Sequence, residues 1–317
     1  MERTIRAAVV GVGYLGRFHA EKYASEPGVE LVAVCDASAD RAREVAGAFG
    51  CGAVTDFREL VGRVDCASVA VPTPLHRDIG VALLDAGVDV LVEKPVAATV
   101  GEARELVARA DDRGRILQVG HLERFNPAIR ALQPILTKPR FIECHRLAPF
   151  VERGTDVDVV LDLMIHDLDV ILSMVASPVA SVEAVGLAVL TASPDIANAR
   201  IRFEDGAIAN VTASRVSMKR ERKLRIFQPD AYISLDYDER RLRICRRVAA
   251  ADGETATIEV EERSVAGQDA LREEIRAFLC AVRSREEPAV SGRVGLRAME
   301  LADRILASVE EALRRSA

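Results

Sequence analysis

The feature that most constrains the fold of this chain is a glycine pattern at Gly11, Gly13 and Gly16. The pattern follows the apolar run TIRAAVV and opens a helical segment, so it stands where a buried strand turns into a helix. Glycines at this spacing permit a tight turn, let the backbone approach a pyrophosphate, and expose the positive end of the helix to it. We therefore expect a dinucleotide phosphate site at this turn. The alternative is a turn that binds no ligand.

The same rhythm of apolar run and helical segment continues to about residue 120. The later runs are VELVAVC, CASVAV, VDVLVE and RILQVG. The clearest helical segment covers residues 99–113, with a capping box formed by Thr99 and Glu102 at its start and Gly114 at its end. Apolar strands separated by helices predict a parallel sheet covered on both faces. Residues 1–121 are therefore expected to form a Rossmann domain.

After residue 122 the pattern changes. Helices are expected at 126–136 and 159–175, with a strand at 141–147 between them. Consecutive strands follow, with a hairpin signal at Asp205-Gly206, and two amphipathic helices end the chain. These strands are VEAVGLAVL, NARIRFE, AIANVTASR, KLRIFQ, AYISLDY, RLRICRR and TATIEVEE. The fold class is thus α/β, with a second domain at 122–317 built on a large, mainly antiparallel open sheet. The last helix could pack back on the first domain.

Composition excludes several other classes of protein. The 317 residues suit two domains, and a net charge of −6 with 4% aromatics and no Trp gives no footprint for nucleic acid. No membrane span is expected, because the longest uncharged stretch, 170–182, is shorter than the roughly 20 apolar residues that a span needs. The six cysteines are scattered without ligand spacing, so we expect reduced thiols, no metal and a cytoplasmic protein.

The choice of dinucleotide depends on Asp36, which ends the second apolar run 20 residues after Gly16. A carboxylate there can accept hydrogen bonds from the adenosine ribose hydroxyls and repels a 2′-phosphate. NAD is therefore favoured over NADP, although Arg41 and Arg43 are nearby cations that would suit NADP.

Two further loops follow strands, VPTPLH at residues 71–76 and VEKP at residues 92–95. Ligands of open parallel sheets bind beyond the carboxyl ends of the strands, so both loops should border the cofactor. The full set of expected cofactor contacts is Gly11, Gly13, Tyr14, Leu15, Gly16, Asp36, Pro72, Thr73, Pro74, His76, Glu93, Lys94, Pro95 and Gln118.

Three side chains could move a proton. Lys94 ends an apolar run, where partial desolvation would lower its pKa; it could equally be a surface lysine paired with Glu93. Asp162 and His166 stand four residues apart on a predicted helix, with Asp169 a near-turn further on. A carboxylate beside a histidine fixes its tautomer, as an acid/base group requires. A core histidine or a metal site are the alternatives.

Together, GVGYLG with Asp36, VPTPLH, EKP and HDLD in this order resemble the Gfo/Idh/MocA family, the glucose–fructose oxidoreductase/inositol dehydrogenase family. The resemblance covers essentially the whole chain. It implies hydride transfer from a carbinol to a nicotinamide, with Lys94, Asp162 and His166 at the reaction centre. It leaves Lys94 and His166 open as the immediate base. It also implies a cis Lys94-Pro95 bond and a homodimer or homotetramer.

The stretches VGHLERFNPA, HRLAPFVERGTD and VVLDLMIHDLD are most similar to the members of the family that oxidise the 3-hydroxyl of UDP-N-acetylglucosamine. In those members the 3-keto product goes to an aminotransferase that makes diamino sugars for lipid A or other envelope glycans, and a 2-oxoacid could be the electron acceptor. Basic side chains near these stretches suit a UDP diphosphate, or are ordinary surface charges. The expected substrate contacts are Lys94, Arg124, Asn126, His145, Arg146, Arg153, Asp162, His166 and Arg215. A dehydrogenase of free sugars or inositol and a non-catalytic dinucleotide-binding regulator are the alternatives.

Overall fold

A computed structural model describes residues 3–151, 157–249, 256–265, 267 and 269–316. The chain divides into two compact units. Unit 1 comprises residues 1–125 and 269–299, and unit 2 comprises residues 126–268 and 300–317. A segment from near the end of the chain thus packs with the first unit. No helix among the described residues is both long enough and apolar enough to cross a membrane.

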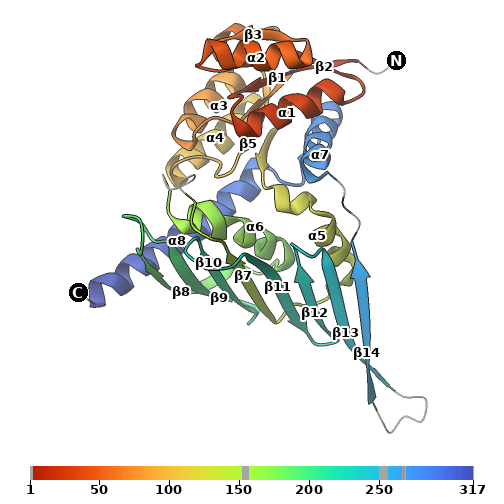
Figure 1. Ribbon diagram of the computed structural model, residues 1–317, viewed down its shortest axis with the longest axis vertical. Helices are drawn as coiled ribbons and strands as arrows, with labels where there is room; N and C mark the ends of the chain where they lie inside the picture. The colour runs from red at the N-terminus through yellow and green to blue at the C-terminus, as the bar shows by residue number, and fades with distance from the viewer. Residues whose placement is uncertain (1–2, 152–156, 250–255, 266, 268, 317) are drawn as a thin grey trace. The chain divides into compact units, whose positions relative to one another are not determined.

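A six-stranded parallel sheet forms the centre of unit 1 (Figure 1). Its strands are β1 (Ile5–Val10), β2 (Val29–Cys35), β3 (Gly52–Val54), β4 (Cys66–Val69), β5 (Asp89–Glu93) and β6 (Leu117–Gly120). They lie in the order β3-β2-β1-β4-β5-β6, so the direction of travel across the sheet reverses between β1 and β4. Five strands match the predicted runs. β3 does not, because an edge strand of three residues is too short to produce a recognisable pattern.

Helices cover both faces of this sheet. One face carries α1 (Tyr14–Ser25), α2 (Ala39–Phe49) and α7 (Ala270–Ser284), whose apolar side chains share one core with the strands. The other carries α3 (His76–Asp85) and α4 (Val100–Arg113), which pack together. The predicted caps of α4 are confirmed: the Thr99 hydroxyl accepts a hydrogen bond from the Glu102 N–H, and Gly114 adopts a left-handed conformation.

Unit 2 is built on an eight-stranded sheet in the order β14-β13-β12-β11-β7-β10-β9-β8. Its strands are β7 (Phe141–Leu147), β8 (Val179–Leu187), β9 (Ile196–Phe203), β10 (Ile208–Ser214), β11 (Glu221–Gln228), β12 (Ala231–Asp236), β13 (Arg241–Ala249) and β14 (Ala256–Ser264). All neighbours pair antiparallel except β7 and β10, which are parallel. The predicted hairpin between β9 and β10 forms, with Gly206 at φ 86°. The expected α/β class with a mainly antiparallel second sheet is confirmed.

Helices pack on one face of this second sheet. They are α5 (Pro127–Leu132), α6 (Ile165–Met174) and the later part of α8 (Gly292–Ser316), which share a core with the strands. The predicted helix at 126–136 ends early and continues as a 3₁₀ turn over Gln133–Ile135, because Pro134 has no N–H to donate in an α-helix. The predicted helix at 159–175 begins as a π-helical turn over Val160–Met164 and continues as α6.

A buried ion pair fixes the connection between β8 and β9. The Asp195 carboxylate accepts hydrogen bonds from the N–H groups of residues 189–191 and lies 2.9 Å from Nε of Arg215, and both side chains are almost fully buried. Burial alone would raise the pKa of Asp195, but these donors outweigh it and hold the pKa well below its usual range.

We expect Asp195→Asn to lower the free energy of unfolding by about 3–5 kcal/mol at neutral pH, because the Arg215 guanidinium then stays buried without its counter-charge. Urea unfolding measures this, with the exposed Asp303→Asn as a control that should change stability by less than about 0.5 kcal/mol.

The stability difference between wild type and Asp195→Asn should depend on pH. A carboxyl with a lowered folded pKa stabilises above its unfolded pKa of about 3.9, and this contribution disappears as pH falls through the folded value. The stability gap between wild type and Asp195→Asn should therefore persist from pH 7 to about pH 5 and shrink below about pH 4. Equal stability at pH 7 would contradict the role of the pair.

Candidate functional site

The glycine turn after β1 brings three backbone segments into direct contact. Gly11 has φ 83°, and a Cβ on it would lie 2.6 Å from the carbonyl oxygen of Ala70. A Cβ on Gly16 would lie 1.8 Å from the carbonyl oxygen of Gly11. Gly13 is different, because a Cβ there would meet nothing nearer than 3.7 Å. Gly11 and Gly16 are thus required by packing, whereas Gly13 leaves open space at the start of α1.

The start of α1 can receive an anion. Gly13 is the N-cap residue and supplies no side-chain hydrogen bond, so the first N–H groups of the helix lack the usual side-chain cap. The side chain of Tyr14 is 69% exposed and that of Leu15 is 37% exposed, so neither covers this end of the helix.

Asp36 lies at the end of β2 and connects the two neighbouring turns. Its carboxylate accepts hydrogen bonds from the N–H of Val12 at 3.0 Å and from the N–H of Ser38 at 2.9 Å. It therefore holds the glycine turn, and it also lines a cavity at these strand ends. Burial and the nearby charge of Asp36 raise the pKa of Cys35 to about 11, so this thiol stays neutral beside the turn.

A cavity of about 560 Å³ opens at these strand ends, within the range of small-molecule sites. Its wall includes Gly11, Gly13, Asp36, Arg41 and Pro72. It lies where β1 and β4 diverge, which is where open α/β sheets bind dinucleotides. Open backbone at Gly13, an uncapped helix start and a carboxylate at the end of β2 together fit the diphosphate and ribose of NAD.

The two arginines that suited NADP differ in their surroundings. The guanidinium of Arg43 donates to the carboxylate of Asp40 at 2.9 Å, on the surface of α2. Arg41 lines the cavity, with its Nη1 3.7 Å from the Cβ position built on Gly13. Of these two arginines, Arg41 is the one positioned to contact a ligand of this cavity.

The loops after β4 and β5 are tied together by His76. Its ring nitrogens lie 2.8 Å from the carbonyl oxygen of Val71 and 2.9 Å from that of Pro95. Burial lowers the pKa of His76, whereas the two carbonyl oxygens act in the opposite direction by accepting from its ring. Thr73 and Pro74 belong to the short 3₁₀ turn between the loop and α3. His76 thus fixes the two loops relative to each other.

Lys94 is half-buried directly after β5, and the Lys94-Pro95 peptide bond is cis, as expected. Two other residues of the expected cofactor set, Glu93 and Gln118, direct their side chains toward α1 and α7. The carboxylate of Glu93 contacts His19 of α1 at 2.9 Å, and the amide of Gln118 donates to the backbone carbonyl oxygen of Glu274 in α7. Their side chains are 9% and 0% exposed and belong to the interior under α1 and α7.

In unit 2, Asp162 lies in the π-helical turn and His166 in the first turn of α6. Both side chains are half-buried, on the helix that packs against β7 and β10. The carboxylate of Asp158 caps this helix by accepting from the N–H groups of Val160 and Leu161. Asp162 and His166 thus stand on one rigid element about a turn apart.

Of the expected substrate contacts in unit 2, two arginines and one histidine have carboxylate partners of their own. Arg146 is 3% exposed and makes a bidentate pair with Asp167, and Arg215 is 4% exposed and pairs with Asp195. His145 alternates with Arg146 along β7, so it lies on the opposite face of the sheet, between Glu143 and Glu221. The two arginines hold the interior of the unit together.

The remaining expected substrate contacts are Arg124, Asn126 and Arg153. Arg124 is half-buried in a 3₁₀ turn over Leu122–Phe125 in unit 1. Asn126 caps α5, its side-chain oxygen accepting from the N–H of Ala128 at 3.0 Å. Arg153 lies outside the described residues.

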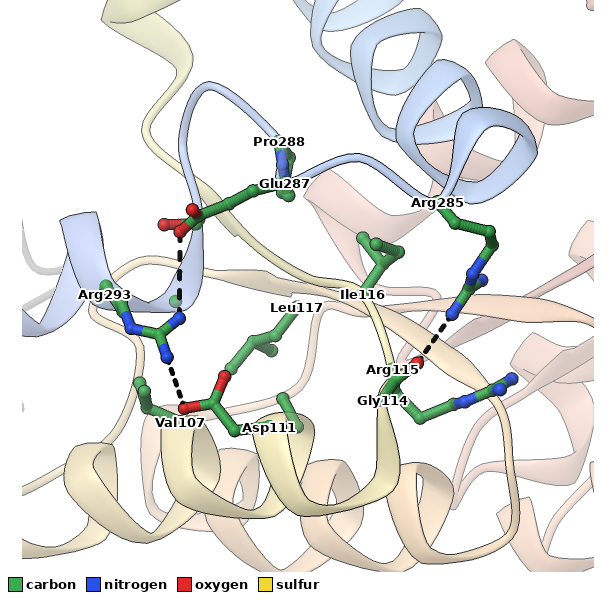
Figure 2. A pocket seen from close by; sticks show the side chains of 13 residues that line it. Val107, Asp111, Gly114, Arg115, Ile116, Leu117, Arg285, Glu287, Pro288 and Arg293 are labelled. Atoms are coloured by element: carbon green, nitrogen blue, oxygen red, sulfur yellow. Dashed lines mark hydrogen bonds and ion pairs between the residues drawn. The ribbon is translucent and has the colours of Figure 1, made fainter.

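Another cavity of unit 1, of about 300 Å³, lies beside the start of β6 (Figure 2). Figure 2 shows Arg293 between Asp111 and Glu287, and Arg285 donating to the carbonyl oxygen of Gly114. Because it borders the amino end of a parallel strand, this cavity is remote from the glycine turn at the carboxyl ends. Its three arginines all have carboxylate partners: Arg293 pairs with Asp111 and Glu287, and Arg115 and Arg285 pair with Asp89.

Family models match both parts of the chain. The model described as an oxidoreductase family with an NAD-binding Rossmann fold matches residues 5–121. The model of the GFO/IDH/MocA C-terminal domain matches residues 136–234. The NAD-binding Rossmann fold expected from the glycine motif is thereby confirmed.

Similar proteins span the full length. The chain is 38% identical to a UDP-N-acetylglucosamine 3-dehydrogenase of Acidithiobacillus ferrooxidans over 98% of this chain and 99% of that protein. A solved structure of that enzyme matches with a TM-score of 0.91 over the same shares of the two chains. An inositol 2-dehydrogenase of Rhizobium meliloti is 25% identical over 97% of this chain and 98% of that protein. From its two matching models and its full-length relatives, the chain belongs to the Gfo/Idh/MocA family of NAD-binding oxidoreductases.

Proposed function

We propose that this protein oxidises the 3-hydroxyl of UDP-N-acetylglucosamine to a ketone, with NAD as the hydride acceptor. The observation that carries the proposal is the 38% identity to a UDP-N-acetylglucosamine 3-dehydrogenase over nearly the whole length of both proteins. The inositol 2-dehydrogenase, at 25% identity, supports the alternative of a free polyol substrate less strongly. A role in diamino-sugar synthesis for lipid A or another envelope glycan belongs to the same proposal.

The cofactor accepts the hydride, and side chains of the protein accept the proton. NAD, when bound, supplies a nicotinamide that accepts the hydride from C3 of the sugar. The hydroxyl proton goes to Lys94 or to His166, and Asp162 orients and stabilises the imidazolium if His166 takes it. The glycine turn and Asp36 hold the diphosphate and the adenosine ribose. A regulator that only binds NAD would need neither a lysine nor a histidine for proton transfer.

The UDP diphosphate needs cationic donors, and we assign this role to Arg124 and Arg153. Arg146 and Arg215 are left out, because their guanidinium groups are paired with Asp167 and Asp195 in the interior. His145 is left out as well, because it stands on the opposite face of the sheet from α6.

We also propose that a second copy of the chain covers the open face of the eight-stranded sheet. Phe141, Phe227 and Tyr232 stack there, and Phe227 is 39% exposed. Apolar surface of this kind is typical of an isologous contact. Light scattering on the purified protein should give the mass of a dimer or tetramer, and a monomer would contradict the proposal.

The substrate is tested by incubating the purified protein with NAD and a panel of UDP-hexoses, free sugars and inositol, with and without a 2-oxoacid. We expect NADH absorbance and a mass loss of two hydrogens with UDP-N-acetylglucosamine. We also expect UDP alone to raise the melting temperature, because a ligand of the native state stabilises it. Turnover of inositol or a free sugar with no shift from UDP would favour the alternative substrate, and tight NAD binding without any turnover would favour a regulator.

The base is tested by Lys94→Met and His166→Ala in single-turnover NAD reduction. Loss of a general base lowers the rate about 10²–10⁴-fold, and we expect this for at least one variant while NAD affinity stays within about threefold of wild type. Wild-type rates in both variants would show that neither side chain takes the proton.

Asp36→Ser tests the ribose contact. The variant loses a charged acceptor for the ribose hydroxyls and the hydrogen bond to the Val12 N–H, so we expect the Kd for NAD to rise about 10- to 100-fold. Affinity for NADP should rise at the same time, because the carboxylate no longer repels the 2′-phosphate and Arg41 remains in the cavity. Fluorescence titration with both cofactors measures this. An unchanged NAD/NADP ratio would contradict the assignment of Asp36.

A further inference from the structure

The interior of unit 1 contains a polar chain that the proposed reaction does not use directly. The hydroxyl of Tyr23 lies 2.8 Å from Oγ of Ser68, which lies 3.0 Å from Nδ1 of His19. Nε2 of His19 lies 2.9 Å from Oε1 of Glu93. The side chains come from α1, β4 and β5, and all are buried. The chain ends at the residue directly before Lys94.

The donors in this chain can be assigned from chemistry. An ionised Glu93 only accepts, so Nε2 of His19 donates to it. A neutral imidazole then has a free lone pair on Nδ1, which accepts from the Ser68 hydroxyl, and Ser68 accepts from Tyr23. Burial raises the pKa of Tyr23 well above its usual value, so this phenol keeps its proton. In this assignment every donor points toward Glu93, which is the order that an ionised carboxylate at that end requires.

A second carboxyl lies beside Glu93. Glu274 of α7 is fully buried, and neither of its carboxyl oxygens has a hydrogen-bond partner among the described residues. One oxygen each of Glu93 and Glu274, together with a ring nitrogen of His19, lie within 4.8 Å of one another. Oε1 of Gln118 also lacks a donor, while its amide donates to the Glu274 carbonyl oxygen. This interior therefore has too few donors for two ionised carboxylates.

A proton on Glu274 removes the deficit. A neutral carboxylic acid carries an O–H that can be donated to an oxygen of Glu93, and two like charges at this separation cannot both persist without water. Burial, and then the charge of Glu93, raise the pKa of Glu274 well above its usual value. The titratable groups shown to interact with this carboxyl are Glu93 of β5 and His19 and Tyr23 of α1. The 3₁₀ turn Leu122–Phe125, which packs against α7, adds the charged residues Glu123 and Arg124 to its surroundings.

We propose that Glu274 is a neutral acid sharing its proton with Glu93, and that the pair holds one negative charge on the residue that directly precedes Lys94 in the chain. This makes Glu274 a positioning residue for the proton transfer at Lys94, so the inference rests on the proposed function. Gly120 belongs to the same arrangement, because a Cβ on it would lie 2.7 Å from the Glu93 carboxylate. The negative charge favours the protonated form of Lys94 and thereby sets the pH at which the lysine can accept a proton.

The first experiment needs no substrate. Infrared difference spectra between wild type and Glu274→Gln at neutral pH should show the carbonyl stretching band of one protonated carboxylic acid in the wild type and its loss in the variant. Loss of an ionised carboxylate band instead would overturn the proposal. So would about one metal ion per wild-type chain that is missing from the variant, because His19, Glu93 and Glu274 would then be ligands of that ion.

The second experiment follows kcat/KM against pH for Glu274→Leu, Glu274→Gln and Leu279→Ala. Leucine removes the donor, and a charge on Glu93 without it is costly in this interior. The proposal therefore expects Glu93 to bind a proton from solvent and the acid limb to move to lower pH by about one unit. Glutamine keeps a donor and should restore the wild-type limb. Leu279 is buried on the same helix, so Leu279→Ala should lower the melting temperature without moving the limb.

Three results would overturn the positioning role. These are an unmoved limb in Glu274→Leu, a limb in Glu274→Gln that matches the leucine variant, or an equal shift in Leu279→Ala. Failure of the proposed function is distinguishable, because the wild type would then give no NADH with UDP-N-acetylglucosamine while the infrared band would still report the state of Glu274.

Discussion

The architecture of unit 1 depends on a backbone-to-backbone contact at its first turn. Gly16 at the start of α1 rests on the carbonyl of Gly11, and Gly11 in turn approaches the carbonyl of Ala70 after β4. No side chain larger than hydrogen fits at either glycine without moving main-chain atoms. This contact brings the positive end of a helix to the place where β1 and β4 diverge. The cavity and the position of Asp36 both follow from it.

Around that turn, several polar side chains hold neighbouring parts of the chain in place. Asp36 holds the glycine loop through the Val12 N–H, and His76 joins the loops after β4 and β5 through their carbonyl oxygens. In unit 2, Arg215 keeps its charge buried because Asp195 provides a matched carboxylate. Charged side chains are retained in both interiors where a partner offsets the cost of removing them from water.

Local patterns in the sequence predicted the fold because each depends on nearby residues. The glycine turn, the caps of α4 and the hairpin at Gly206 were all correct. Two elements differ from the prediction for local reasons that the spacing of apolar residues does not reveal. β3 is too short to give a pattern, and Pro134 converts the end of a predicted helix into a 3₁₀ turn. One signal was present but overlooked, since Glu274 interrupts the apolar stripe of α7 at a buried position.

By itself, the sequence determined the α/β class, the dinucleotide turn, Asp36 and the order of the family motifs, because these are set by spacing along the chain. Only the tertiary structure decided which charged side chains have partners. Arg146 and Arg215 have side chains that suit a phosphate, but they are paired with carboxylates inside unit 2. The Gln118 amide donates to the backbone of α7 and does not line the cavity at the glycine turn. The reason is physical: a charge or amide is satisfied by whichever group the fold brings within about 3 Å, and that group is far away in sequence.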